Sequence, residues 1–213
     1  VLYWVARAEG GAGPELTEPA GDIMRIPFGQ TTAEYFWTSE DSGGNCTGCH
    51  TLAESANRMV VTYQGVNGNF AIIDITDPDN LEVLTEPSED RRATFHAASP
   101  DGQFLLGVSD GRAKLFSMGD GSLITELGLD GYNVSHPDWS PDGEHVLLVR
   151  TTSTYMSDMN FEGGEIIQLR FNKGDTSFGE PEVLVPASDT YNNYYPAYAP
   201  DGQWIAFNRA VRT

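Results

Sequence analysis

The chain has 213 residues, and its 39% hydrophobic content is sufficient for a packed globular core. Asp and Glu total 31 against 12 Lys and Arg, so the formal net charge is −19. This charge repels phosphate backbones and anionic membrane surfaces, so we do not expect a nucleic-acid partner. No apolar run is long enough to cross a bilayer, and we expect no transmembrane segment.

The chain opens with an apolar stretch, residues 1–6, which is typical of a strand already under way. It carries no initiating Met and no signal peptide. We therefore expect a processed or incomplete chain, with further sequence in the native protein.

A Gly- and Ser-rich segment over residues 39–50 ends in Cys46-Thr47-Gly48-Cys49-His50. This is the attachment pattern of c-type haem, in which two thiols form thioethers with the porphyrin and the adjacent imidazole ligates iron. Both cysteines of the chain lie in the pattern. It predicts haem c held by Cys46, Cys49 and His50. A local Cys46–Cys49 disulfide or dithiol, and a partial metal site, are the alternatives.

An internal repeat follows the motif. Its copies are Ser99-Pro100-Asp101-Gly102, Ser140-Pro141-Asp142-Gly143 and Ala199-Pro200-Asp201-Gly202, with a degenerate copy over residues 53–56. Pro, Asp and Gly in this order favour a tight turn, and each copy precedes an apolar run. The aspartates lie 41 and 59 residues apart, a period typical of four-stranded blades. We predict strands at residues 104–108, 113–118, 123–127, 146–150, 166–171 and 204–208.

The repeat predicts an all-β fold, a β-propeller of four-stranded antiparallel blades. About four blade periods are present, so residues 1–213 form a single partial propeller domain that belongs to a larger propeller. We expect residues 39–50 to be an inter-blade loop, and residues 151–164 and 172–179 to be loops within the longest repeat. The turns, with Ile72-Ile73-Asp74-Ile75-Thr76-Asp77-Pro78, resemble the repeats of TolB-like propellers. The resemblance and the haem motif both imply an exported protein, periplasmic or extracellular.

The second axial ligand is harder to predict. His96 follows His50 by 46 residues, the offset of the repeat, and is a possible ligand from the next blade. Met156 and Met159 lie in the polar insertion and are the next candidates. His136 aligns with Phe95 and Tyr195, a pattern that indicates packing.

Three functions follow from these observations. The first is a haem-bearing propeller that relays electrons or serves as a redox subunit of a larger complex. The second is a non-enzymatic scaffold with a Cys46–Cys49 disulfide, whose blades bind other proteins. The third is a haem enzyme with its substrate site in blades outside this sequence. Other protein subunits or redox partners are expected in each case, and whether the protein is an enzyme stays open.

Overall fold

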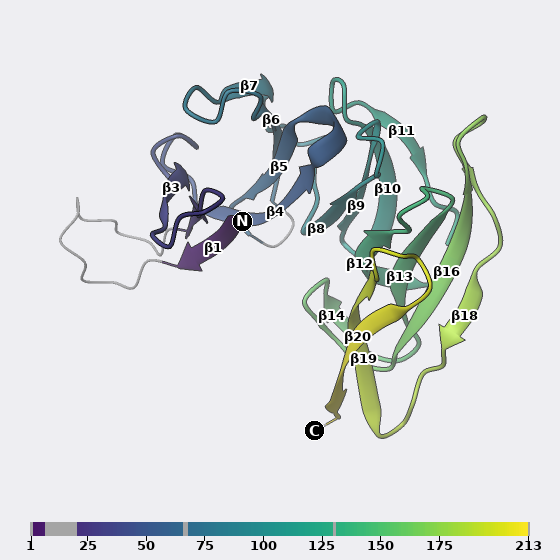
Figure 1. The fold of residues 1–213 in the computed structure, drawn as a ribbon. Helices are drawn as coiled ribbons and strands as arrows, with labels where there is room; N and C mark the ends of the chain where they lie inside the picture. Colours follow the sequence, from purple (N-terminus) through teal and green to yellow (C-terminus); the bar gives the residue numbers. More distant parts are fainter. Residues whose placement is uncertain (1, 7–20, 66–67, 130, 213) are drawn as a thin grey trace.

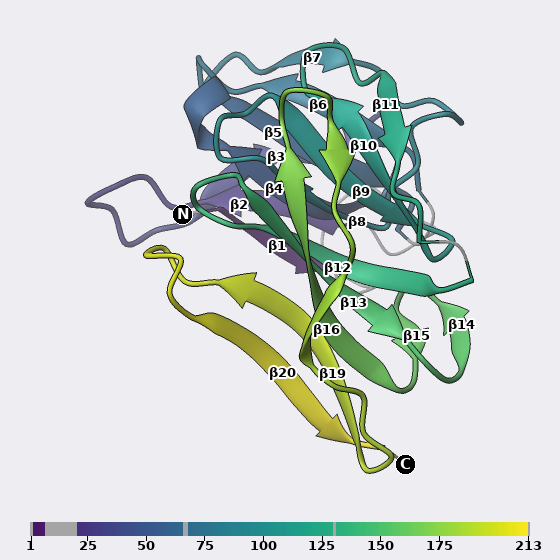
Figure 2. The same cartoon turned by 90° about the vertical axis from the view of Figure 1, so that its right-hand side faces the viewer.

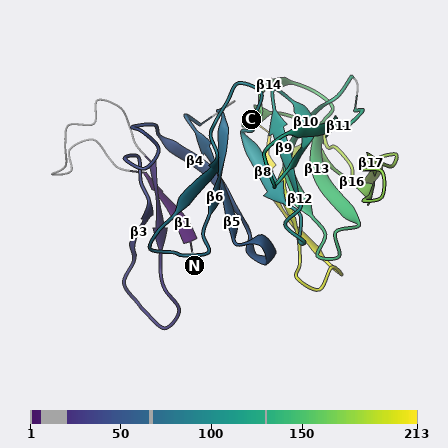
Figure 3. The same ribbon diagram turned by 90° about the horizontal axis from the view of Figure 1, so that it is seen from above.

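The computed structural model describes residues 2–6, 21–65, 68–129 and 131–212. In these residues the regular structure is β-strand, apart from one short 3-10 helix, η1 (Glu54–Ala56). The strands fall into antiparallel sheets that stand side by side like the blades of a fan (Figures 1 and 3). The predicted all-β propeller fold is confirmed.

Each sheet is formed by strands that follow one another along the chain. The first contains β1 (Leu2–Ala6), β2 (Gly21–Arg25) and β3 (Glu34–Trp37). The second contains β4 (Thr47–Ala53), β5 (Arg58–Tyr63), β6 (Phe70–Asp74) and β7 (Glu82–Thr85). The third contains β8 (Phe95–Ala98), β9 (Phe104–Ser109), β10 (Arg112–Ser117) and β11 (Leu123–Glu126).

The fourth sheet contains β12 (Asn133–Trp139), β13 (His145–Thr151), β16 (Gly164–Asn172) and β18 (Glu182–Val185), and the short β17 (Ser177–Phe178) also pairs with β16. A pair, β19 (Tyr191–Tyr198) and β20 (Ile205–Val211), follows it. The first strands of the last four sheets, β4, β8, β12 and β19, contact one another in that order. We call these four the inner strands.

The Ser-Pro-Asp-Gly turns join each inner strand to the second strand of its sheet, as the repeat predicts. In the turn after β12, Asp142 Oδ1 accepts hydrogen bonds from the Ser140 hydroxyl at 2.6 Å and from the Glu144 amide at 2.9 Å. Gly143 follows with a φ of 71°, which a side chain would oppose. A Cβ placed on Gly143 would lie 3.7 Å from Pro100 Cδ, so each turn packs against the preceding one.

Apolar side chains fill the spaces between neighbouring sheets in three clusters. One lies between the first two sheets and includes Ile23, Met59 and Ile73, all fully buried. The second and third sheets enclose Val60 and Phe116 among others, and the largest cluster lies between the third and fourth sheets. The second and third sheets are therefore held on both faces by their neighbours, which is the packing of propeller blades.

The prediction of loops is wrong in part for three segments, because each contains strand residues. Residues 151–164 contain a hairpin, β14 (Tyr155–Ser157) and β15 (Asn160–Phe161), at one end of the β13–β16 sheet (Figure 2). Residues 172–179 contain β17, which pairs back onto β16. The segment at 39–50 leaves the loop conformation at Thr47, because backbone pairing with β5 begins there. The second thiol of the motif thus belongs to a strand.

Among the described residues, no helix is long and apolar enough to cross a membrane.

Candidate functional site

The inner strands bring equivalent residues together near their starts. β12 and β19 each contain a register shift there, with His136 at a φ of 47° and Tyr195 at a φ of 49°. β4 contains the corresponding shift between Thr47 and His50. Cys49 therefore occupies the place that His136 and Tyr195 hold in later sheets. The motif lies at the end of the inner strands opposite the Ser-Pro-Asp-Gly turns.

Aromatic rings pack at this end of the inner strands. The His136 ring lies 3.9 Å from Tyr195, 4.4 Å from Phe95 and 5.6 Å from Phe161, measured between centroids. Burial lowers the pKa of His136 to about 4, although the charge of Asp158 opposes the shift. The His136 Nδ1 atom is buried and has no hydrogen-bond partner in the described part of the chain. The neutral ring acts as a packing residue, as its alignment predicts.

The two cysteines lie on one side of β4. The Gln64 amide donates to the Cys46 carbonyl at 2.8 Å, so the pairing of β4 with β5 continues back to Cys46. Side chains alternate between the two sides of a strand, and residues three apart would normally point in opposite directions. Between Thr47 and His50, β4 contains one residue more than the facing part of β5, and this bulge removes one step of the alternation. The side chains of Cys46 and Cys49 therefore share a side.

Both cysteines are free thiols in the structure and are partly buried. Burial raises the pKa of the Cys49 thiol, so this group is protonated at neutral pH. A reactive thiolate needs the opposite environment, with neighbouring positive charge and a lowered pKa. Cys49 therefore lacks the environment of a nucleophile.

His50 lies on the other side of the strand. It pairs with Val61, and Leu52 two residues later pairs with Met59. Val61, Met59 and Leu52 belong to the cluster between the first and second sheets, so His50 faces the first sheet. Burial lowers its pKa and keeps the imidazole neutral.

This placement tests whether the motif can hold haem as folded. Attachment requires the imidazole of His50 on the iron of a porphyrin joined to both thiols. In β4 the thiols point to one side of the strand and His50 to the other. The three side chains do not fit one haem while residues 47–50 remain paired with β5.

His96 lies between the second and third sheets, next to Thr62. Its Nε2 atom lies 3.0 Å from Thr62 Oγ1, and the Thr62 hydroxyl donates its own proton to the Ala93 carbonyl at 2.7 Å. Thr62 must then accept from His96 Nε2–H, which leaves a lone pair on Nδ1. That atom is buried without a hydrogen-bond partner among the residues described.

Burial also lowers the pKa of His96 to about 4, with a smaller contribution from His50, while the backbone of Cys49 opposes the shift. His96 is thus a neighbour of the motif, as its repeat offset predicts. Its role as an iron ligand stays a prediction.

Met156 and Met159 lie on the β14–β15 hairpin and are 63% and 59% exposed. Asp158 between them is buried. Its carboxylate accepts from Thr94 Oγ1 at 2.6 Å, from Tyr155 Oη at 2.5 Å and from the amide of Gly111 at 2.8 Å. Asp158 fixes the hairpin over the third and fourth sheets. The sequence carried no signal for it, because its partners come from distant segments.

The architecture and the spacing of the inner strands define a β-propeller. No family model matches the chain. The uncharacterised peptidase YuxL of Bacillus subtilis is 29% identical over 147 residues, which cover 56% of this chain and 22% of that protein. The chain therefore spans about a fifth of this relative.

Solved structures share the fold. The putative TolB of Agrobacterium tumefaciens matches with a TM-score of 0.59 at 16% identity, over all of this chain and 71% of the other. The Swd1 propeller domain of Myceliophteria thermophila has a TM-score of 0.58 at 13% identity, over 90% of this chain and 59% of the other. The dihydro-heme d1 dehydrogenase NirN has a TM-score of 0.54 at 15% identity, over 76% and 32% respectively. The chain is similar to these proteins in fold.

Proposed function

We propose that the chain is part of an exported protein-interaction scaffold in which Cys46 and Cys49 form a local disulfide. The observation that carries this proposal is the shared side of the two thiols in β4. With one residue absorbed by the bulge, the cysteines are about two strand positions apart, which is close to the longest separation that a disulfide bridges. Disulfides bridge Cα separations up to about 6.8 Å. The raised pKa of Cys49 suits a structural bond better than a redox-active one.

The same end of the inner strands offers apolar surface for a partner protein. Tyr195 is 48% exposed beside the buried His136 ring, and the exposed Met156 and Met159 stand on the hairpin anchored next to it. Exposed aromatic and methionine side chains are common at protein interfaces. Export supplies the oxidising compartment in which a disulfide persists. The resemblance to TolB-like propellers supports both features, and the peptidase named among the relatives is no part of the proposal.

Mass spectrometry of protein purified from an oxidising compartment tests the disulfide. We expect the mass of the polypeptide less two hydrogens, with neither thiol alkylated until a reductant is added. Cys46→Ser should leave Cys49 open to alkylation in the folded protein. Full alkylation of both cysteines in the untreated native protein would contradict the disulfide.

Covalent haem c is the second candidate, and the complete Cys-x-x-Cys-His pattern favours it. Such a protein would serve electron transfer or act as a redox subunit, with Cys46 and Cys49 as attachment points and His50 as ligand. His96, or else Met156 or Met159, would be the second ligand. Because His50 faces away from the thiols, this function requires residues 47–50 to leave the sheet. A pyridine haemochrome spectrum of protein matured with haem c assembly decides between the candidates, and thioether-linked haem would overturn the disulfide.

A further inference from the structure

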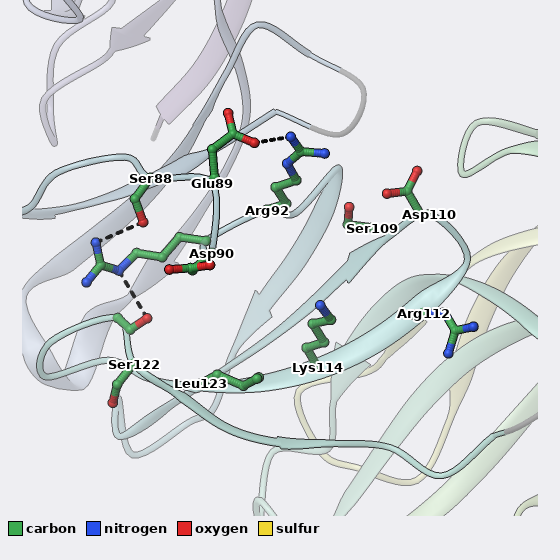
Figure 4. Close-up of a pocket in the computed structure, with 12 residues that line it drawn as sticks. Ser88, Glu89, Asp90, Arg92, Ser109, Asp110, Arg112, Lys114, Ser122 and Leu123 are labelled. Carbon is green, nitrogen blue, oxygen red and sulfur yellow. Dashed lines mark hydrogen bonds and ion pairs between the residues drawn. The ribbon is translucent and has the colours of Figure 1, made fainter.

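A cavity of about 650 Å³ opens beside the third sheet, and its lining does not include the cysteine motif (Figure 4). The loop before β8 forms one wall, and β10 with its two flanking turns forms the other. This volume is typical of sites for small organic ligands. Four of the 12 basic residues of the chain line it: Arg91, Arg92, Arg112 and Lys114.

Strand alternation directs two of these cations into the cavity. Ala113 and Leu115 of β10 are buried in the cluster between the third and fourth sheets. Arg112 and Lys114 therefore lie on the opposite face of β10. Lys114 Nζ lies 3.4 Å from Glu126 Oε1, whereas Arg112 has no ion pair or hydrogen bond within the described residues.

The opposite wall is held rigid by Arg91. Its guanidinium donates to the carbonyls of Gly121 at 3.2 Å, Glu86 at 3.1 Å and Asp120 at 3.3 Å, and to Ser88 Oγ at 3.2 Å. Gly121 has a φ of 70°, and a Cβ there would lie 2.7 Å from Arg91 Nε. Carbonyl acceptors fix this side chain and leave its positive charge uncompensated, since no carboxylate in the described ranges pairs with it.

The acidic residues of the cavity compensate only part of this charge. Glu89 is paired with Arg92, and Asp90 and Asp110 are the other carboxylates of the lining. The lining holds four cations, and Glu126 beside it pairs with Lys114, so Arg91 and Arg112 are the two cations that no carboxylate of the described residues pairs with. Positive groups held together in a concave site concentrate anions there.

We propose that this cavity binds a small polyhydroxylated anion, a sugar-sized molecule that carries a phosphate or carboxylate group. Arg112 and Lys114 contact the anionic group, because Arg112 has no other partner among the described residues and Lys114 pairs only with the part-exposed Glu126. Three serine hydroxyls and Asp90 line the same space and can hydrogen-bond to ligand hydroxyls: Ser88, Ser109 and Ser122. The proposal concerns a site separate from the cysteine motif and does not depend on the function proposed above.

Calorimetric titration of the purified chain with glucose 6-phosphate, gluconate, glucose and inorganic phosphate tests the proposal. We expect the two sugar anions to bind more tightly than glucose or inorganic phosphate, with an affinity that falls as salt is added. Glucose 6-phosphate against gluconate distinguishes a phosphate ligand from a carboxylate ligand. Equal binding of glucose and both anions, or no heat with any probe at low salt, would overturn the proposal.

Variants locate the binding. Arg112→Gln removes no ion pair or hydrogen bond made within the described part of the chain, and should weaken binding of the anion about tenfold. Lys173→Gln is the matched control, because Lys173 pairs with Asp101 outside the cavity, at 2.6 Å. An unchanged affinity in Arg112→Gln, or an equal loss in Lys173→Gln, would show nonspecific attraction and contradict the site.

Discussion

The two ends of the inner strands differ in what the repeat preserves. At the turn end, Asp101, Asp142 and Asp201 each accept the amide two residues ahead, at 2.9 to 3.0 Å, and a glycine of positive φ follows each. At the other end, equivalent positions hold Cys49, Phe95, His136 and Tyr195. The turn end needs one backbone conformation, which only certain residues provide. The end at which the inner strands start, here called the starting end, needs only side chains that fill the space there. The residue types at that end can therefore differ between blades and suit the function of this protein.

The buried histidines at the starting end should make stability depend strongly on pH. The folded-state pKa values of His96 and His136 are about 4, below the ordinary value of 6.5. Each neutral ring contributes stability that is full above pH 6.5 and is lost as the pH falls toward 4. Between pH 7 and 5 we expect a loss of about 2 kcal/mol from each histidine. Urea denaturation at a series of pH values measures this.

One substitution separates the two histidines. His136→Phe keeps a ring among Phe95 and Tyr195 but does not titrate, so the loss between pH 7 and 5 should shrink by about 2 kcal/mol. Tyr195→Phe also alters the ring cluster and should retain the full pH dependence. An equal pH dependence in native protein and His136→Phe would show that the ring does not resist protonation.

The Asp158 carboxylate makes the next largest contribution to the free energy of unfolding at the starting end of the inner strands. Asp158→Ala leaves the Thr94 hydroxyl and the amides of Asp110 and Gly111 without their acceptor. We expect a loss of about 3 kcal/mol in the free energy of unfolding, because buried donors lose their partners. Limited proteolysis should then cut within residues 153–163. The exposed Asp189→Asn is the control, and a similar small effect of both substitutions would contradict the anchor.

These expectations also show what the sequence could predict. The turn residues act on their own backbone, so strands 104–108, 113–118 and 146–150 follow from local chemistry and are confirmed. The side of β4 that Cys46 faces depends on one extra residue opposite β5, and no local pattern reveals a bulge. The cavity beside β10 joins residues 88–92 with residues 109–123 only after the sheets pack. Contacts made across the fold were therefore missed.

Replacing the turn glycine with alanine should destabilise two of the turns by different amounts. Gly102 and Gly202 have φ values of 67° and 69°, so alanine is strained at both, by about 1 kcal/mol. A Cβ on Gly102 would lie 2.5 Å from Ala56 Cβ, whereas on Gly202 the nearest atom is Pro141 Cδ at 3.7 Å. Overlap adds about 2 kcal/mol at Gly102 alone. Thermal unfolding of both variants measures the difference, and equal shifts would refute the stacked turns.

The smallest effect concerns one hydroxyl that the third turn lacks. Ser140 Oγ donates to Asp142 and accepts from the His145 amide at 2.9 Å, while Ala199 occupies the same place in the third turn. A single hydrogen bond of this kind contributes about 1 kcal/mol, and less where water can replace it. Ser140→Ala should therefore cost about 1 kcal/mol, and Ala199→Ser should add a few tenths, because its turn is more exposed. Urea unfolding of both variants tests this, and a gain from Ser140→Ala would show that the hydroxyl does not stabilise the turn.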